Sequence, residues 1–97
     1  MKAIAISSFG GPEVLKVQDF PKPIISPNEV LIKVKAAGIN RPDIFQRKGN
    51  YHPPKGVVDI PGLEVAGIVE EIGTNVKNVK LGDRVMALLA GGGYAEY

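Results

Sequence analysis

The chain has 97 residues, which suits one small domain with a single core and leaves no room for a second domain. Its 12 Lys and Arg and 10 Asp and Glu nearly balance, and the basic residues are scattered, so nucleic-acid binding is not favoured. Cysteine is absent, which excludes disulfides and favours a reducing compartment. The longest apolar run, Val85 to Ala90, is far shorter than the ~20 residues of a membrane-spanning helix. We therefore expect a cytoplasmic protein that binds neither membrane nor nucleic acid.

Frequent turn-forming residues predict a mainly β fold, since the chain holds 12 Gly and 8 Pro. In a strand predicted over 29–37, the even-numbered residues share the face toward the core and Leu31 faces mostly water. A strand over 63–72 has apolar residues on both faces, as in a covered sheet. With further strands the pattern predicts a small, partly open β-barrel. The further strands are 2–6, 13–18 and 84–89.

One short helix is predicted to interrupt these strands. Pro42 suits its first residue, and Gly49 supplies its C-terminal stop. Asp43 lies in the positive first turn and is expected to pair with Arg47 at the i, i+4 spacing. Two apolar residues are expected to form the buried side of the helix: Ile44 and Phe45.

Polar side chains able to orient a ligand gather in residues 37–67, so any site is expected there. They include Asn40, Tyr51 and Glu64. His52 is the only histidine, but in a Pro-rich loop with no second ligand we expect a surface residue rather than a base.

Glu70 and Glu71 are neighbours that could be read as paired carboxylates. Adjacent strand residues point to opposite faces of a sheet, so these two are not expected to converge. The pair therefore argues against glycosidase chemistry, which needs two carboxylates on either side of one bond.

Three motifs carry a family resemblance that covers nearly the whole chain. AAGIN at 36–40, PGLEVAGIVEEIG at 61–73 and KLGDRVMA at 80–87 resemble the N-terminal GroES-like domain of the medium-chain dehydrogenase/reductase superfamily. Within it, NRPDIFQRKGNYHPP at 40–54 and ALLAGGGYAEY at 87–97 resemble the zinc-independent quinone oxidoreductases, especially the p53-inducible group. Residues 1–97 would then be the N-terminal portion of a GroES-like catalytic domain.

The resemblance also bears on zinc. Zinc alcohol dehydrogenases place a Cys where this chain has Asn40 and a His where it has Leu63, because zinc binds thiolate and imidazole. Leu63 has no lone pair, and Glu64 beside it cannot rebuild the site alone. The resemblance therefore implies no metal site. Hydride transfer to a quinone or conjugated enone tolerates this loss, because the acceptor itself stabilises the incoming charge.

By the same resemblance the cofactor is NADPH, held mainly by a Rossmann domain that this chain lacks. The triplet Gly91–Gly93 is no substitute, since it lacks the spacing and the following helix that bind a pyrophosphate. The implied substrate is a small-molecule quinone or enone, and the parent protein is expected to be a homodimer. Alone, the 97 residues should be inactive or nearly so.

Two residues match positions that contact the cofactor in the family. Asn40 resembles the residue that faces the nicotinamide ribose, although it could equally be a cap before Pro42. Tyr51 resembles the tyrosine that approaches the nicotinamide and the substrate carbonyl, where a phenol can donate a hydrogen bond. We thus expect Asn40 and Tyr51 to bind cofactor and Tyr51 to be catalytic; a half-buried loop aromatic is the alternative for Tyr51.

Two other functions stay open at this point. An enoyl-thioester reductase of the same superfamily also uses a tyrosine and no metal. A stand-alone binding module is possible because co-chaperonins share the fold, but the chain lacks their long polar mobile loop.

Overall fold

The computed structural model describes all 97 residues and contains five strands and one α-helix. The mainly β fold with one short helix is therefore confirmed. In chain order the elements are β1 (Lys2–Ile6), a 3-10 turn (Pro12–Val14), β2 (Leu15–Asp19), β3 (Val30–Ala37), α1 (Arg41–Lys48), β4 (Glu64–Ile72) and β5 (Arg84–Leu88).

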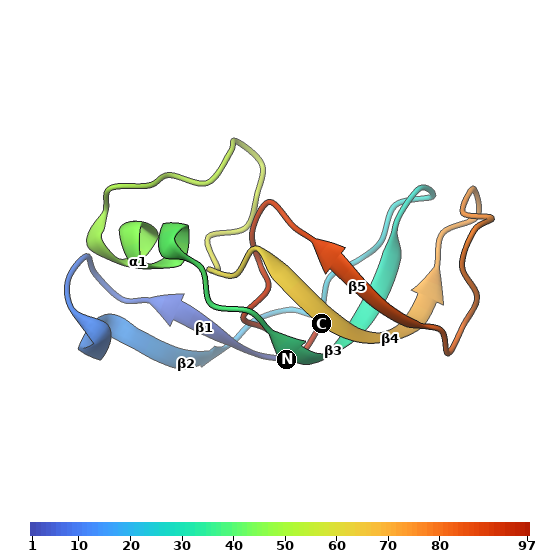
Figure 1. The fold of residues 1–97 in the computed structure, drawn as a ribbon, viewed down its shortest axis with the longest axis horizontal. Helices are drawn as coiled ribbons and strands as arrows, with labels where there is room; N and C mark the ends of the chain where they lie inside the picture. The colour runs from blue at the N-terminus through green and yellow to red at the C-terminus, as the bar shows by residue number, and fades with distance from the viewer.

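The strands form two antiparallel sheets that do not close on one another. One sheet pairs β1 with β2, and the other has the order β3-β4-β5 (Figure 1). The last residues of the chain connect the two: Ile4 N donates to Tyr94 O at 2.9 Å, and Val34 N donates to Glu96 O at 2.8 Å. The expectation of a partly open barrel is confirmed.

Two irregularities in the pairing of β3 with β4 overturn the simple alternation expected for β3. The register shifts between Leu31 and Ile32, and again between Val34 and Ala36. Leu31, expected to face mostly water, is only 3% exposed. Leu31 lines a groove together with Ile25, so its burial involves a segment outside the sheet, which periodicity along one strand does not reveal.

The same irregularity affects the two adjacent carboxylates of β4. Leu31 pairs with Glu71 and Ile32 with Val69, so Glu70 is the residue left without a partner. Both carboxylates approach one ammonium group: Lys22 Nζ lies 3.2 Å from Glu70 and 3.9 Å from Glu71. The expectation that they cannot converge was therefore wrong, and the bulge is the reason.

β4 alternates clearly between a buried and an open face, contrary to the prediction that both would be covered. Val65 and Val69 are 5% and 1% exposed, whereas Ala66 between them is exposed. On the neighbouring strand β5, Met86 and Leu88 are each 87% exposed. The sheet β3-β4-β5 thus has one face toward the core and one apolar face in the open. No helix of this fold has the length and apolar character to cross a lipid bilayer.

A close backbone contact aligns the chain before β4 with the glycine-rich segment after β5. Gly93 N donates to Gly62 O at 3.0 Å, and Tyr94 N donates to Pro61 O at 2.9 Å. Gly62 has a positive φ of 107°, and a Cβ added there would lie 2.7 Å from Gly93 Cα. Only glycine combines this backbone conformation with so close an approach.

We expect Gly62→Ala to destabilise the protein by about 3 kcal/mol or more, because it adds a backbone clash to the strain of positive φ. Gly82→Ala is the matched control: Gly82 also has positive φ (85°), but nothing lies within 4 Å of its added Cβ. That control should lose only about 1 kcal/mol. Urea unfolding measures both, and equal losses would contradict the role assigned to the Gly62–Gly93 contact.

Candidate functional site

Asn40 occupies the N-cap position of α1, with extended backbone angles of φ −129° and ψ 157°. Its backbone N–H donates to Asp43 Oδ2 at 2.8 Å, and its carbonyl oxygen accepts from Asp43 N at 3.0 Å. Asp43 is at the third position of the helix, and an acidic side chain there that accepts from the N-cap backbone N–H is one half of a capping box. The cap role that the sequence left open is confirmed. Contact between half-buried Asn40 and a cofactor stays a prediction.

The carboxylate of Asp43 receives hydrogen bonds from three separate parts of the chain. Besides Asn40 N, Tyr94 Oη donates to Oδ2 at 2.7 Å, and Gly62 N donates to Oδ1 at 3.3 Å. Asp43 is only 6% exposed, so these donors replace most of its hydration. One buried anion therefore links the start of α1, the chain before β4 and the end of the glycine-rich segment.

The buried side of α1 is polar, so the prediction that Ile44 and Phe45 form it was wrong. The buried residues of the helix are Asp43 and Gln46, while Phe45 is 43% exposed. Residues three apart share one helix face. Gln46 Nε2 donates to Asp59 Oδ1 at 3.1 Å, which ties the middle of the helix to the loop that follows it.

The other end of α1 is fixed by Arg47. Its Nε donates to Gly10 O at 3.0 Å, and Gly10 N donates to Arg47 O at 3.1 Å. The predicted Asp43–Arg47 ion pair was therefore wrong: each side chain finds a partner far away in the sequence. Gly49 ends the helix in the left-handed conformation (φ 86°), as predicted.

Tyr94 is held as a hydrogen-bond donor. Burial raises the pKa of its phenol above the ordinary value of 10.0, and the hydrogen bond to the Asp43 carboxylate and the negative charge of that group raise the pKa further. The phenol consequently keeps its proton at any physiological pH and continues to donate to Asp43.

Tyr51 and His52 follow α1 in the long loop that runs over the top of the molecule in Figure 1. Tyr51 is half-buried and His52 is exposed, as expected for a surface histidine. Asn40 and Tyr51 flank α1 at opposite ends, and eight helical residues span about 12 Å. The structure thus places the two predicted site residues beyond opposite ends of one helix, and no hydrogen bond joins them.

Leu63 and Glu64 lie at the start of β4, beside the end of β3. Gly38 N donates to Glu64 O at 3.3 Å, and the Glu64 side chain fills the space where a Cβ on Gly38 would be. Nowhere in the chain do three or more His, Cys, Asp or Glu side chains gather as they would around a metal ion. A groove of about 560 Å³ begins here on the open face of the sheet. Its lining consists of Ala36, Ala37, Gly38, Glu64, Val65, Ala66, Met86, Ala87 and Leu88.

Comparison with known proteins assigns the family. Residues 26–97, most of the chain, match the family model of the alcohol dehydrogenase GroES-like domain. The chain belongs to this family. Among curated proteins it is 48% identical to the quinone oxidoreductases of Lama guanicoe and Sus scrofa over 99 aligned residues, which cover all of this chain. The predicted likeness to quinone oxidoreductases of the medium-chain dehydrogenase/reductase superfamily is confirmed.

Solved structures agree with this assignment. The GroES-like chain superposes on the human synaptic vesicle membrane protein VAT-1 homolog-like protein with a TM-score of 0.89 at 40% identity, covering 99% of this chain and 31% of that one. It superposes on the Escherichia coli quinone oxidoreductase complexed with NADPH with a TM-score of 0.84 at 40% identity, covering 99% and 29%. The chain spans about 30% of the length of the curated relatives.

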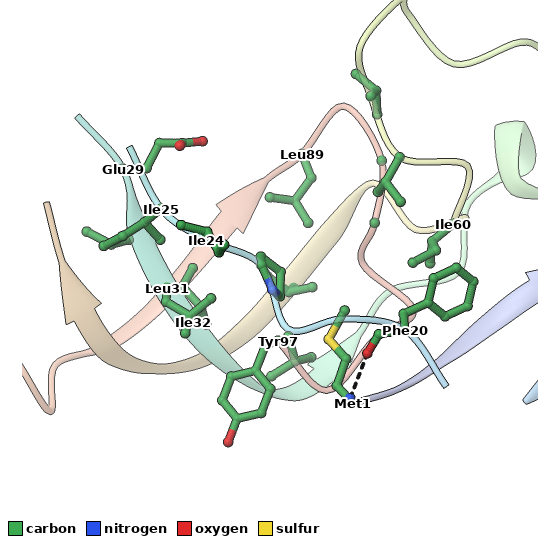
Figure 2. Close-up of a pocket in the computed structure, with 18 of the residues that line it drawn as sticks. Met1, Phe20, Ile24, Ile25, Glu29, Leu31, Ile32, Ile60, Leu89 and Tyr97 are labelled. Carbon is green, nitrogen blue, oxygen red and sulfur yellow. Dashed lines mark hydrogen bonds between the residues drawn. The ribbon is translucent and has the colours of Figure 1, made fainter. Parts of the chain in front are cut away.

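A second groove of the GroES-like chain, about 530 Å³, lies between the buried face of the sheet β3-β4-β5 and the segment 20–25 (Figure 2). Its lining is mainly aliphatic, with Ile24, Leu31 and Leu89 among the labelled side chains. Neither Asn40 nor Tyr51 lines it. This groove lies apart from the predicted site.

Sequence reasoning assigned Asp43 the wrong partner and gave Tyr94 no role in the site region. The one available signal for Tyr94 was its place directly after three glycines, which allow two backbones to approach closely. Nothing local indicated that its hydroxyl would reach Asp43, 51 positions earlier.

We expect Tyr94→Phe to lower the free energy of unfolding at neutral pH by roughly 1 to 2 kcal/mol, because a hydrogen bond to a charged group is lost. The two proteins should become more alike in free energy of unfolding above about pH 10. There Tyr94 of the unsubstituted protein ionises in the unfolded state but keeps its proton in the folded state. The unfolded state then binds fewer protons, so the stability of the native protein falls as the pH rises.

Urea unfolding of both proteins from neutral to alkaline pH measures this difference. Titration of the folded proteins, followed by tyrosinate absorbance, gives a second test. Near pH 10, Tyr94→Phe should show the same absorbance rise as the native protein. A smaller rise in the variant would mean that Tyr94 ionises normally.

Proposed function

We propose that this chain is the N-terminal, cofactor-facing part of an NADPH-dependent quinone oxidoreductase that works without zinc. The observation that carries the proposal is the 43–48% identity, over the whole chain, to several mammalian quinone oxidoreductases. Because the chain covers only 30% of those proteins, the activity is proposed for the complete protein. We expect that protein to be a cytosolic homodimer, and residues 1–97 alone to show little or no turnover.

NADPH is the proposed cofactor because it is present in the related Escherichia coli enzyme, whose fold this chain shares. When bound, the reduced nicotinamide supplies a hydride. Asn40 suits a contact with the ribose, since its amide both donates and accepts hydrogen bonds and it lies half-buried at a helix end. The choice between NADPH and NADH would be made mainly by the nucleotide-binding domain outside this chain.

The absence of zinc is proposed from the chemistry of the donor set. The positions that resemble zinc-ligand positions carry an amide, Asn40, and an aliphatic side chain, Leu63. Two carboxylates lie nearby: Glu64 is in an otherwise apolar groove over Gly38, and both oxygens of Asp43 accept hydrogen bonds from within the protein. Zinc requires three or four His, Cys, Asp or Glu ligands in tetrahedral geometry. The residues present do not fit the ion.

Tyr51 is the proposed hydrogen-bond donor to the acceptor. A phenol that donates to a carbonyl oxygen stabilises the negative charge that develops there during hydride transfer. An ortho- or para-quinone already delocalises this charge, so one donor in place of a Lewis acid suffices. The half-buried position of Tyr51, in the loop that leaves the far end of α1, is compatible with this role.

In the complete protein that contains this chain, we expect NADPH oxidation that depends on an added ortho- or para-quinone and is unaffected by chelators. Tyr51→Phe should lower kcat by roughly tenfold or more and leave the fold intact, because it removes only the donated hydrogen bond. Absorbance of NADPH follows the reaction.

The alternatives are separated in the same assay. A faster rate with a crotonyl thioester than with any quinone would identify an enoyl-thioester reductase. Activity that is lost on chelation and restored by zinc would contradict the metal-free mechanism. No oxidation with either acceptor would reject the reductase function and return attention to a binding module.

A further inference from the structure

We propose that Asp43 and Tyr94 are a positioning pair, which holds Asn40 in the orientation that receives the dinucleotide cofactor. The inference deepens the proposed function and rests on it. Neither residue is assigned a contact with cofactor or substrate: both act through the backbone of Asn40.

The Tyr94 hydroxyl and the Asn40 backbone N–H donate to the same oxygen atom of Asp43. Asp43 Oδ2 accepts from Tyr94 Oη at 2.7 Å and from Asn40 N at 2.8 Å. A displacement of that oxygen would therefore also shift the Asn40 peptide group, which is hydrogen-bonded to it. Since the phenol keeps its proton, the Tyr94 hydroxyl is a constant restraint on the oxygen.

The second oxygen of the carboxylate reaches the groove edge. Asp43 Oδ1 accepts from Gly62 N at 3.3 Å, and Gly62 directly precedes Leu63 and Glu64. One carboxylate that is 6% exposed thus links Asn40 to this edge, in addition to the backbone bond from Gly38 N to Glu64 O. No side-chain cation pairs with that carboxylate, since Arg47 bonds to Gly10 instead. The hydrogen-bond donors to this carboxylate are thus all neutral.

Removing the Tyr94 hydroxyl should loosen one end of α1 and leave the helix docked. The other end remains tied by the reciprocal hydrogen bonds of Arg47 and Gly10, and the middle by Gln46 and Asp59. The expected defect is thus local to Asn40 and Gly62, whereas a purely structural role would loosen the whole helix.

The test compares two Tyr→Phe variants of the complete protein. Tyr94→Phe should raise the dissociation constant of NADPH by about five- to tenfold, because Asn40 would then hold the binding orientation for only part of the time. Its kcat at saturating NADPH should stay within about twofold of the native value. Tyr97→Phe is the matched control, since the Tyr97 ring lies 4.2 Å from Lys22 Nζ and does not bond to Asp43. It should bind NADPH like the native protein; equal binding by both variants would overturn the inference.

Amide hydrogen exchange gives a readout that does not depend on cofactor binding. The N–H groups of Asn40 and Gly62 should exchange several-fold faster in Tyr94→Phe than in Tyr97→Phe, while that of Gly10 stays unchanged. Equal exchange at Asn40, or equal acceleration at Gly10, would overturn the positioning role. If the native protein failed to bind NADPH, the proposed function would fail, and the exchange pattern would still decide whether the pair positions Asn40.

Discussion

The carboxylate of Asp43 is the constraint on which the placement of the candidate site depends. A buried charge is tolerated only when hydrogen bonds replace its lost hydration. Here the donors are Tyr94 Oη and the backbone N–H groups of Asn40 and Gly62, which come from three distant parts of the sequence. Because the anion requires them together, the start of α1, the start of β4 and the end of the glycine-rich segment acquire one fixed mutual arrangement. A capping box is usually a local interaction, but here its carboxylate also binds groups that are distant in the sequence.

Local rules predicted the local features of this fold. Gly49 ends α1 in the left-handed conformation, and the strands lie within a residue or two of their expected positions, since capping and alternation involve near neighbours only. The expectations that were wrong involve distant partners. Asp43 and Arg47 could have paired along the helix, yet each bonds to a residue far away in sequence. Leu31 is buried and lines a groove with Ile25 from outside the sheet, and the alternation along its own strand gives no sign of that contact.

The candidate site shows the same division. The family motif indicated Asn40 and Tyr51, and the structure explains the cap position of the first without testing its contact with a cofactor. The sequence indicated no role for Tyr94, because the role of a hydroxyl depends on its hydrogen-bond partner in the folded protein. The close approach of Gly62 to Gly93 brings Tyr94 to Asp43. The glycine residues in the sequence do not indicate which side chain is positioned by this backbone contact. Residue type and spacing could thus suggest the ligand-facing positions but not the groups that orient them.

The way α1 is attached decides how sensitive the site is to small changes. Only 14 of the 97 residues are buried, and the helix faces the protein with Asp43 and Gln46 rather than with an apolar stripe. Apolar burial is non-directional, so a helix held by it can shift with little loss of free energy. Hydrogen bonds weaken steeply with distance and angle, so a helix held by them has one preferred orientation. A site on such a helix is well defined while every donor is present, and it is altered when a single oxygen atom is removed. The polar attachment of α1 therefore favours precision at Asn40 over tolerance to substitution.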